Sequence, residues 1–322
     1  MAAKDILVVG ELPAKTEKTL AAAFAARRVA AGASAAPALD ETGATIRGIA
    51  RGGHFAIDGA LIDRLPKLEI IASFGVGYDG IDLERAAGRG IIVTNTPDVL
   101  TEEVADTALG LLLMTVRELS AAERWLRAGR WARDGNYRLT PATLRNRTVG
   151  IVGLGRIGAA IARRLDAMQV PVAYHNRHRR DDVAYPYHAS VRDLATAVDI
   201  LVVVLPGTAA TGNIVDATVL RALGADGILI NIGRGSAVDE PALIAALRDG
   251  VILAAGLDVF AHEPDVPPEL MALPNAVLLP HLGSASVFTR DAMGQLVVDN
   301  LRSWFEDGRP LTPVAETPWP RQ

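Results

Sequence analysis

The sequence predicts an α/β protein made of two domains, each with a parallel sheet covered by helices. Three observations lead to this prediction. Short apolar runs rich in β-branched residues alternate with helical patterns along the chain, and parallel neighbours need such helical crossovers. A length of 322 residues suggests about two domains. Finally, the spacing GxGxxG at Gly153, Gly155 and Gly158 lies in the middle of the chain, after a strand-like run.

The first hundred residues already alternate between strand and helix. Strands are expected at 6–9, 45–49, 69–72 and 91–94, and helices at 14–26, 59–65 and 83–87. A long helix is expected from Thr101 to about Ala128, with Glu102 and Glu103 in its first turn, where negative charge suits the helix dipole. The Arg-rich segment 127–147 is expected to be irregular. With Trp125, Trp131 and Tyr137 it is a candidate contact with a partner subunit.

The alternation resumes at Thr148 and predicts five or six parallel strands. After the strand at 148–152, strands are expected at 172–174, 200–205, 227–231, 254–257 and 276–279, and helices at 190–197, 216–223, 240–248 and 285–305. The Pro-rich tail at 310–320 is expected to be extended and to lie on the surface.

The glycine spacing indicates a dinucleotide site. The first glycine permits a tight turn, the second lets the backbone approach a pyrophosphate, and the third allows close helix-on-strand packing. The motif follows the strand-like residues 149–152 and precedes Ile157, Ile161 and Leu165 at helical spacing, so its context fits; a purely structural turn is the alternative. We therefore expect two Rossmann-like domains. A dinucleotide-binding domain at 100–285 is inserted into a substrate-binding (catalytic) domain at 1–99 plus 286–322, with a cleft between them.

Composition excludes several classes of function. The net charge of −4 and the lack of a long basic run argue against nucleic-acid binding. The chain has no cysteine, which excludes disulfides and thiolate catalysis. No apolar run approaches the roughly 20 residues that span a bilayer, and the start of the chain does not read as an export signal. We expect a soluble, cytoplasmic protein without a membrane or nucleic-acid partner, and no metal site.

The end of the second strand of this domain bears on cofactor choice. An NAD site places an acidic residue about 20 residues past the glycine motif, to bind the ribose hydroxyls, whereas an arginine accommodates a 2′-phosphate. Here the strand continues as His175, Asn176, Arg177 and a further basic run to Arg180, and no acid occurs before Asp181. This predicts NADP (NADPH) over NAD; a solvated basic turn with loose use of NAD is the alternative.

Several motifs resemble one known family. The segments GVGYDGID, NTPDVLTEEVAD, GLGRIG, NIGRGSAVDE, GLDVFAHEP and LLPHLGSAS occur in the order seen in D-2-hydroxyacid dehydrogenases, from about Gly75 to the C-terminal helix. The chain is most similar to the NADPH-dependent glyoxylate, hydroxypyruvate and hydroxyphenylpyruvate reductases of that family. The resemblance implies that Arg234 binds substrate, that His281 is the acid/base, and that Glu263 is the carboxylate partner of His281.

General chemistry accounts for these residue types. Hydride transfer to a ketone leaves charge on oxygen, so a proton donor is needed, and histidine titrates nearest to neutral pH. A carboxylate beside the imidazole favours its charged form and fixes which nitrogen faces the substrate. An arginine can bind a carboxylate and polarise the ketone. Taken singly, Arg234, Glu263 and His281 could instead be structural residues of loops and helix ends.

Further contacts follow from the turn at 75–77 and from the resemblance. Consecutive N–H groups there can bind an anion, and the family pattern assigns the substrate carboxylate to Val76 and Gly77; a plain tight turn is the alternative. The resemblance implies a set of cofactor contacts, of which Asp258 could equally be a helix cap. They are Gly153, Gly155, Arg156, Ile157, Gly158, Asn176, Arg177, Leu205, Pro206, Ile232, Asp258, His281 and Gly283.

The sequence thus predicts an NADPH-dependent reductase that converts a small 2-oxo acid, glyoxylate or hydroxypyruvate first, to the D-2-hydroxy acid, acting as a homodimer. One alternative is an NAD-dependent D-lactate or phosphoglycerate type of dehydrogenase. Another is a dinucleotide-sensing corepressor. Substrate selectivity is expected to depend on His54, Phe55, Val76 and a neighbouring subunit's Trp131.

Overall fold

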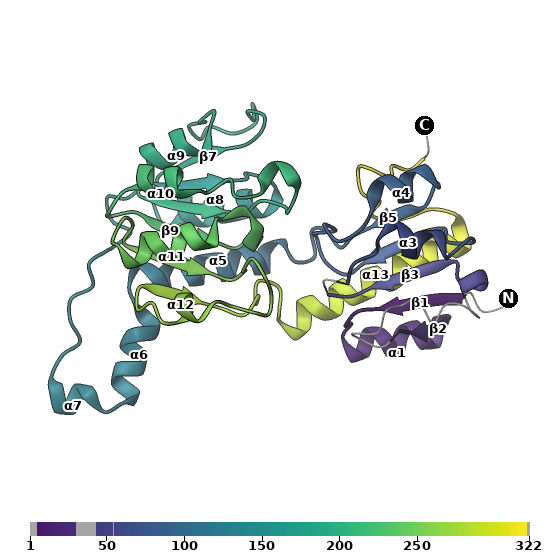
Figure 1. Cartoon of the computed structure of the whole chain (residues 1–322), viewed down its shortest axis with the longest axis horizontal. Helices are drawn as coiled ribbons and strands as arrows, with labels where there is room; N and C mark the ends of the chain where they lie inside the picture. Colours follow the sequence, from purple (N-terminus) through teal and green to yellow (C-terminus); the bar gives the residue numbers. More distant parts are fainter. Residues whose placement is uncertain (1–4, 30–42, 54, 321–322) are drawn as a thin grey trace. The chain divides into compact units, whose positions relative to one another are not determined.

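The computed structural model describes residues 5–29, 43–53 and 55–320, and the chain divides into two compact units (Figure 1). One unit joins Met1–Leu100 to Ala285–Gln322, and the other is Thr101–Ser284. Each unit has one sheet whose neighbouring strands run parallel, so the predicted α/β fold class is confirmed.

The sheet of the first unit has the order β2-β1-β3-β4-β5. Its strands are β1 (Asp5–Val9), β2 (Ala25–Arg28), β3 (Gly48–Arg51), β4 (Ile70–Ser73) and β5 (Ile92–Thr94). Its helices are α1 (Ala14–Ala23), η1 (Gly43–Thr45), α3 (Gly59–Asp63), α4 (Leu83–Gly88) and α13 (Val287–Asp307). Alternate strand residues face opposite sides, because side chains in a strand point up and down in turn. Leu7, Ile49 and Ile71 therefore pack with α3, while Gly48 lies under Leu301 and Phe305 of α13.

The second unit has six parallel strands in the order β11-β10-β9-β8-β6-β7. They are β6 (Val149–Val152), β7 (Val172–His175), β8 (Ile200–Val203), β9 (Ile228–Asn231), β10 (Ala254–Leu257) and β11 (Ala276–Leu278). The chain moves from β6 to β7 on one side and then returns to place β8 on the other. The carboxyl ends of β6 and β8 therefore form a topological switch point, where open α/β sheets bind ligands.

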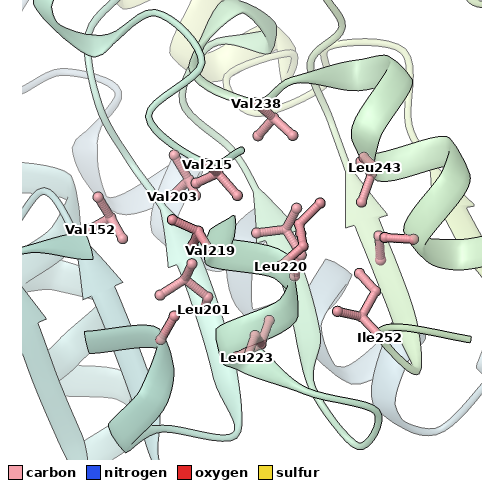
Figure 2. Packing of buried hydrophobic residues seen from close by; sticks show 14 of the residues in the cluster. Val152, Leu201, Val203, Val215, Val219, Leu220, Leu223, Val238, Leu243 and Ile252 are labelled. Atoms are coloured by element: carbon pink, nitrogen blue, oxygen red, sulfur yellow. The ribbon is translucent and has the colours of Figure 1, made fainter. Parts of the chain in front are cut away.

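Helices cover both faces of this sheet. Helices α5 (Thr101–Val116) and α8 (Arg156–Ala167) lie on one face; α9 (Val191–Ala197), α10 (Ala217–Leu223) and α11 (Glu240–Arg248) lie on the other. Figure 2 shows the second of these layers, in which Val203 and Leu201 of β8 pack beside Val219 and Leu220 of α10. The remaining elements are η2 (Ala209–Thr211), η3 (Gly235–Ala237) and α12 (Pro268–Met271).

The single long helix expected from Thr101 to about Ala128 is wrong. Helix α5 ends at Val116, and α6 (Leu119–Arg127) begins after Glu118, which has the left-handed conformation with φ 50°. The Glu118 carboxylate accepts hydrogen bonds from the Tyr137 hydroxyl at 2.8 Å and from Arg138 at 2.7 Å, and these contacts hold the bend. The segment expected to be irregular also contains the short helix α7 (Arg130–Asp134).

Two other expectations need correction. The helix predicted at 14–26 ends at Ala23, and the edge strand β2 follows, paired with β1 from Asp5↔Ala25 onward. The Ala-rich sequence favours a helix locally, but strand pairing overrides that preference. The tail at 310–320 is not simply on the surface: Val314 is 5% exposed, and its N–H donates to the Val93 carbonyl at 2.9 Å.

Candidate active site

The glycine turn lies between β6 and α8, as predicted. Gly153 has φ +103°, and a Cβ there would lie 2.5 Å from the Val204 carbonyl oxygen. A Cβ on Gly158 would lie 2.2 Å from the Gly153 carbonyl oxygen, so the third glycine permits the close helix-on-turn packing. Gly155 is different, because the space where its Cβ would stand is open to 4 Å.

This open space lies at the start of α8, where Arg156 and Ile157 are the first helical residues. The N-cap Gly155 has no side chain, and the first turn contains no acidic residue. The first N–H groups of a helix lack intrahelical partners and favour an anion. An exposed glycine, a bare helix start and a switch point together fit the pyrophosphate of a dinucleotide.

The residues after β7 lie beside this turn. The Asn176 side-chain oxygen accepts a hydrogen bond from the Leu154 N–H at 2.6 Å, which places the end of β7 next to the glycines. Arg177 follows and is exposed, as are His178 and Arg179. Asn176 thus contacts the glycine turn, whereas the next residue, Arg177, is exposed.

The loops after β8 and β9 approach each other at the same edge of the sheet. Ile232 is 6% exposed, and its N–H donates to the Val203 carbonyl at 3.1 Å. A Cβ on Gly233 would lie 2.7 Å from the Leu205 nitrogen, so glycine is needed for these loops to touch. Pro206 follows, and its carbonyl accepts the Thr211 hydroxyl at 2.7 Å.

Arg234 is presented by a turn that Asn231 holds from the end of β9. The Asn231 amide donates to the Arg234 carbonyl at 3.0 Å, and its oxygen accepts the Gly233 N–H at 3.1 Å. Arg234 is half-buried, and one of its guanidinium nitrogens donates to the Gly233 carbonyl at 2.8 Å. The next residue, Gly235, lies directly against the Phe260 backbone, where a Cβ would be 1.9 Å from the carbonyl oxygen.

Glu263 and His281 form the hydrogen-bonded pair that the resemblance implies. The His281 Nδ1 and the Glu263 Oε2 are 2.7 Å apart, and the two side chains are 33% and 19% exposed. The other Glu263 oxygen accepts the Phe260 N–H at 3.0 Å, so the carboxylate is fixed on both sides. His281 itself has φ +54°, a left-handed conformation that is uncommon for a residue with a Cβ. Such local strain is typical of functional positions.

Asp258 fixes the loop that carries His281. It follows β10, is 1% exposed, and its two oxygens accept the N–H groups of Leu282 at 2.6 Å and Gly283 at 2.8 Å. Its carbonyl also accepts the His281 N–H at 2.9 Å. Burial raises the pKa of the Asp258 carboxyl, and the two N–H donors oppose that rise. The structure therefore adds a loop-holding contact that the sequence did not predict; the predicted contact of Asp258 with the cofactor stays a prediction.

Val76 and Gly77 belong to the other unit, so their approach to His281 stays a prediction. They follow β4 and are half-buried. Gly75 has φ +141° and donates its N–H to the Thr96 hydroxyl at 3.0 Å, and the Asn95 amide donates to the Val76 carbonyl at 2.9 Å. The turn is thus held from the end of β5. Phe55 is half-buried, and His54 lies outside the described residues.

Sequence reasoning missed Asn231 and Glu240 as supports of this edge. Glu240 is 7% exposed, and its carboxylate accepts the Ala261 N–H at 3.2 Å, in the loop between Phe260 and Glu263. The signal was available in NIGRGSAVDE, because a polar residue that ends an apolar strand and an acid that begins a helix are candidates for fixing neighbouring loops.

The described residues contain neither a metal-binding group nor a membrane-spanning helix. Within 5–29, 43–53 and 55–320, no three or more His, Asp or Glu side chains gather as a metal-binding group. In the same part of the chain, none of the helices has the length and apolar character to cross a bilayer.

Comparison with known proteins identifies the class. Residues 109–283 match the family description "D-isomer specific 2-hydroxyacid dehydrogenase, NAD binding domain". The chain therefore belongs to the D-isomer specific 2-hydroxyacid dehydrogenase family, and it is an NAD(P)-dependent oxidoreductase. Both the predicted resemblance and the predicted enzyme class are confirmed.

The relatives are similar over most of their length. The chain is 52% identical to glyoxylate/hydroxypyruvate reductase A of Arabidopsis thaliana and 47% identical to hydroxyphenylpyruvate reductase of Plectranthus scutellarioides. Each match spans 270 residues, 84% of this chain and 86% of the relative. Among solved structures, the NADPH-dependent glyoxylate/hydroxypyruvate reductase of Sinorhizobium meliloti, in complex with NADP and malonate, is 54% identical with a TM-score of 0.95. That match covers 100% of this chain and 99% of that one.

Proposed function

We propose that this protein reduces a small 2-oxo acid, glyoxylate or hydroxypyruvate first, to the 2-hydroxy acid with NADPH, with the D configuration where the product is chiral. The observation that carries the proposal is the Glu263–His281 pair, 2.7 Å apart, in the loops that follow the strands of the dinucleotide sheet. The relatives whose names include glyoxylate and hydroxypyruvate support the substrate class.

The residues divide the reaction between them. When bound, the reduced nicotinamide supplies a hydride for the ketone carbon. Because Glu263 accepts a hydrogen bond from Nδ1 of His281, the proton for the developing alkoxide comes from Nε2. Glu263 stabilises the charged imidazole before that transfer. Arg234 binds the substrate carboxylate and polarises the ketone, while Val76 and Gly77 donate N–H groups to the carboxylate.

The cofactor preference rests on the end of β7. Arg177 is exposed there, one residue after Asn176, which contacts the glycine turn. A guanidinium at this position suits a 2′-phosphate, and no carboxylate follows Asn176 until Asp181 to bind the ribose hydroxyls of NAD. The NADP complex of the Sinorhizobium meliloti relative supports the same choice. Weaker use of NADH is expected.

The working form is a homodimer in the cytoplasm, and the α6–α7 arm supplies the contact. Figure 1 shows α6 and α7 extending away from the rest of their unit, and neither helix has a buried residue. Leu126 is 54% exposed and Trp131 58% exposed on this arm. Large apolar side chains exposed in this way are typical of a surface that a second copy covers. Sedimentation of the full chain tests it: a monomer at micromolar concentration would contradict the proposal.

The catalytic proposal is tested by cofactor oxidation with glyoxylate, hydroxypyruvate, pyruvate and a phenylpyruvate-type acid, each with NADPH and NADH. We expect the highest kcat/KM with NADPH and one of the first two acids. His281→Ala should lower kcat strongly while NADPH still binds, because the proton donor is lost and the cofactor turn is not. Unchanged turnover in that variant would remove His281 from the mechanism. If the unsubstituted protein reduced none of the four acids, the proposed function would be overturned.

A further inference from the structure

The backbone of Leu154, between the first two glycines of the turn, is held at both its N–H and its carbonyl by the loop after β7. Its N–H donates to the Asn176 side-chain oxygen at 2.6 Å, and its carbonyl accepts Nη1 of Arg180 at 2.8 Å. The Leu154 side chain is buried, 1% exposed. The two successive peptide groups that flank Leu154, in a turn that has to meet a pyrophosphate, are therefore each held by a side chain from one neighbouring loop.

The Arg180 guanidinium is held in this arrangement by further hydrogen bonds. Its Nε donates to one Asp182 oxygen at 2.9 Å, and its Nη2 donates to the other. With Nη1 on Leu154, all three guanidinium nitrogens donate to protein oxygens. The hydrogen bonds to Asp182 raise the pKa of the Arg180 guanidinium. A planar guanidinium bound in this two-pronged way is orientationally fixed.

The backbone of Arg180 is held as well. The Tyr174 side chain, fully buried in β7, accepts the Arg180 N–H at 2.8 Å and donates to the Arg180 carbonyl at 3.2 Å. The loop then returns to the same strand, because the Tyr174 N–H donates to the Pro186 carbonyl at 2.9 Å and His188 donates to the Tyr174 carbonyl at 2.9 Å. Arg180 thus reaches Leu154 from a loop anchored at both ends on β7.

We propose that Arg180 and Asn176 are positioning residues for the pyrophosphate turn, and that Arg180, although part of the basic run, takes no part in selecting the 2′-phosphate. The inference rests on the proposed dinucleotide site. It assigns Arg177 of the basic run to the 2′-phosphate and Arg180 to holding the turn. If the turn is already ordered before the cofactor binds, the binding free energy is not reduced by the entropy cost of ordering it. Because the pyrophosphate is common to both cofactors, the contribution of Arg180 should be the same for NADPH and NADH.

The test compares Arg180→Met with Arg179→Met, the adjacent exposed arginine, in the full chain. Calorimetric titration gives the Kd of NADPH and of NADH without any acid present. Losing a charge-assisted hydrogen bond in Arg180→Met should weaken both cofactors by the same factor, about 5- to 30-fold. Arg179→Met should leave NADH binding unchanged. At saturating cofactor, kcat of Arg180→Met should stay within about 2-fold of the unsubstituted protein, because no reacting group is removed.

A second readout needs no cofactor. Hydrogen exchange of the peptide covering 149–158 in the unliganded protein should be faster in Arg180→Met and in Asn176→Ala than in Arg179→Met. If Arg180→Met does not fold, Asp182→Asn is the second variant, because it keeps the arginine but weakens the two hydrogen bonds that orient its guanidinium. It should lower the affinity for NADPH and for NADH by the same, smaller factor.

Loss of NADPH affinity alone would make Arg180 a ligand of the 2′-phosphate and overturn the inference. Unchanged exchange of the turn would do the same. Failure of the unsubstituted protein to bind either cofactor would instead refute the proposed function, and the exchange comparison would still judge the contact between Arg180 and Leu154.

Discussion

Replacing Glu263 with glutamine tests the Glu263–His281 pair of the site most directly. The glutamate accepts two hydrogen bonds, one from His281 Nδ1 at 2.7 Å and one from the Phe260 N–H at 3.0 Å. A glutamine amide has one acceptor oxygen and one donor nitrogen. Either the nitrogen faces His281, which favours the wrong tautomer, or it faces the Phe260 N–H, which leaves two donors opposed. In both cases the charge that stabilises the imidazolium is gone.

The size of the effect follows from the bond that is lost. A hydrogen bond to a charged group contributes about 1.5–3 kcal/mol. If the charged imidazole is the proton donor, Glu263→Gln should lower kcat roughly 10- to 100-fold, since about 1.4 kcal/mol is a factor of ten. NADPH affinity should change less than about 2-fold, because no cofactor contact proposed for the turn is touched.

The assay is steady-state oxidation of NADPH by glyoxylate and hydroxypyruvate at saturating substrate, with NADPH affinity measured separately. Glu269→Gln is the matched control. Glu269 is exposed in α12, and its substitution removes the same charge from the same region of the chain. A kcat for Glu263→Gln within about 2-fold of the control would refute the reasoning that the carboxylate stabilises the acid.

Three further outcomes are expected. Arg177→Ala should weaken NADPH about 10-fold or more and NADH little, by the loss of a charge-assisted pair; equal losses in titration would refute the 2′-phosphate role. Gly158→Ala should lower the free energy of unfolding by about 2 kcal/mol, because its Cβ would lie 2.2 Å from the Gly153 carbonyl, whereas Gly88→Ala, with open space, should not. Tyr185, whose pKa is raised to about 12 mainly by burial and next by its hydrogen bond to Asp166, keeps its proton in the fold when the unfolded chain has lost it. Denaturant unfolding should therefore show stability falling from about pH 10 to pH 12, and falling less in Tyr185→Phe.

The sheet of the second unit could be predicted closely from the sequence. Helix α11 and strand β10 match the expected bounds, 240–248 and 254–257. These elements have strong local signals: β10 is a run of four buried residues, and Asp239 caps α11 with its side chain where the helix begins.

The features that could not be predicted depend on partners distant in sequence. Strand β2 reads AARR and is a strand because β1 offers it a free edge. The bend at Glu118 is held by Tyr137 and Arg138, about 20 residues later. Motif resemblance named Glu263 and His281, but not the support that Asp258 gives to the His281 loop, because the Asp258 carboxylate accepts backbone N–H groups, which almost any residue could donate.

The discontinuous first unit has a consequence for synthesis of the chain. Helix α13 covers the face of the first sheet where Gly48 lies under Leu301 and Phe305, and it is separated from β5 in sequence by the whole second unit. On a ribosome, the dinucleotide unit is complete while this face of the earlier unit still lacks its cover. Because of this order of emergence, the first hundred residues are the last to complete their native core. Until α13 is made, their sheet exposes apolar surface that a chaperone could bind.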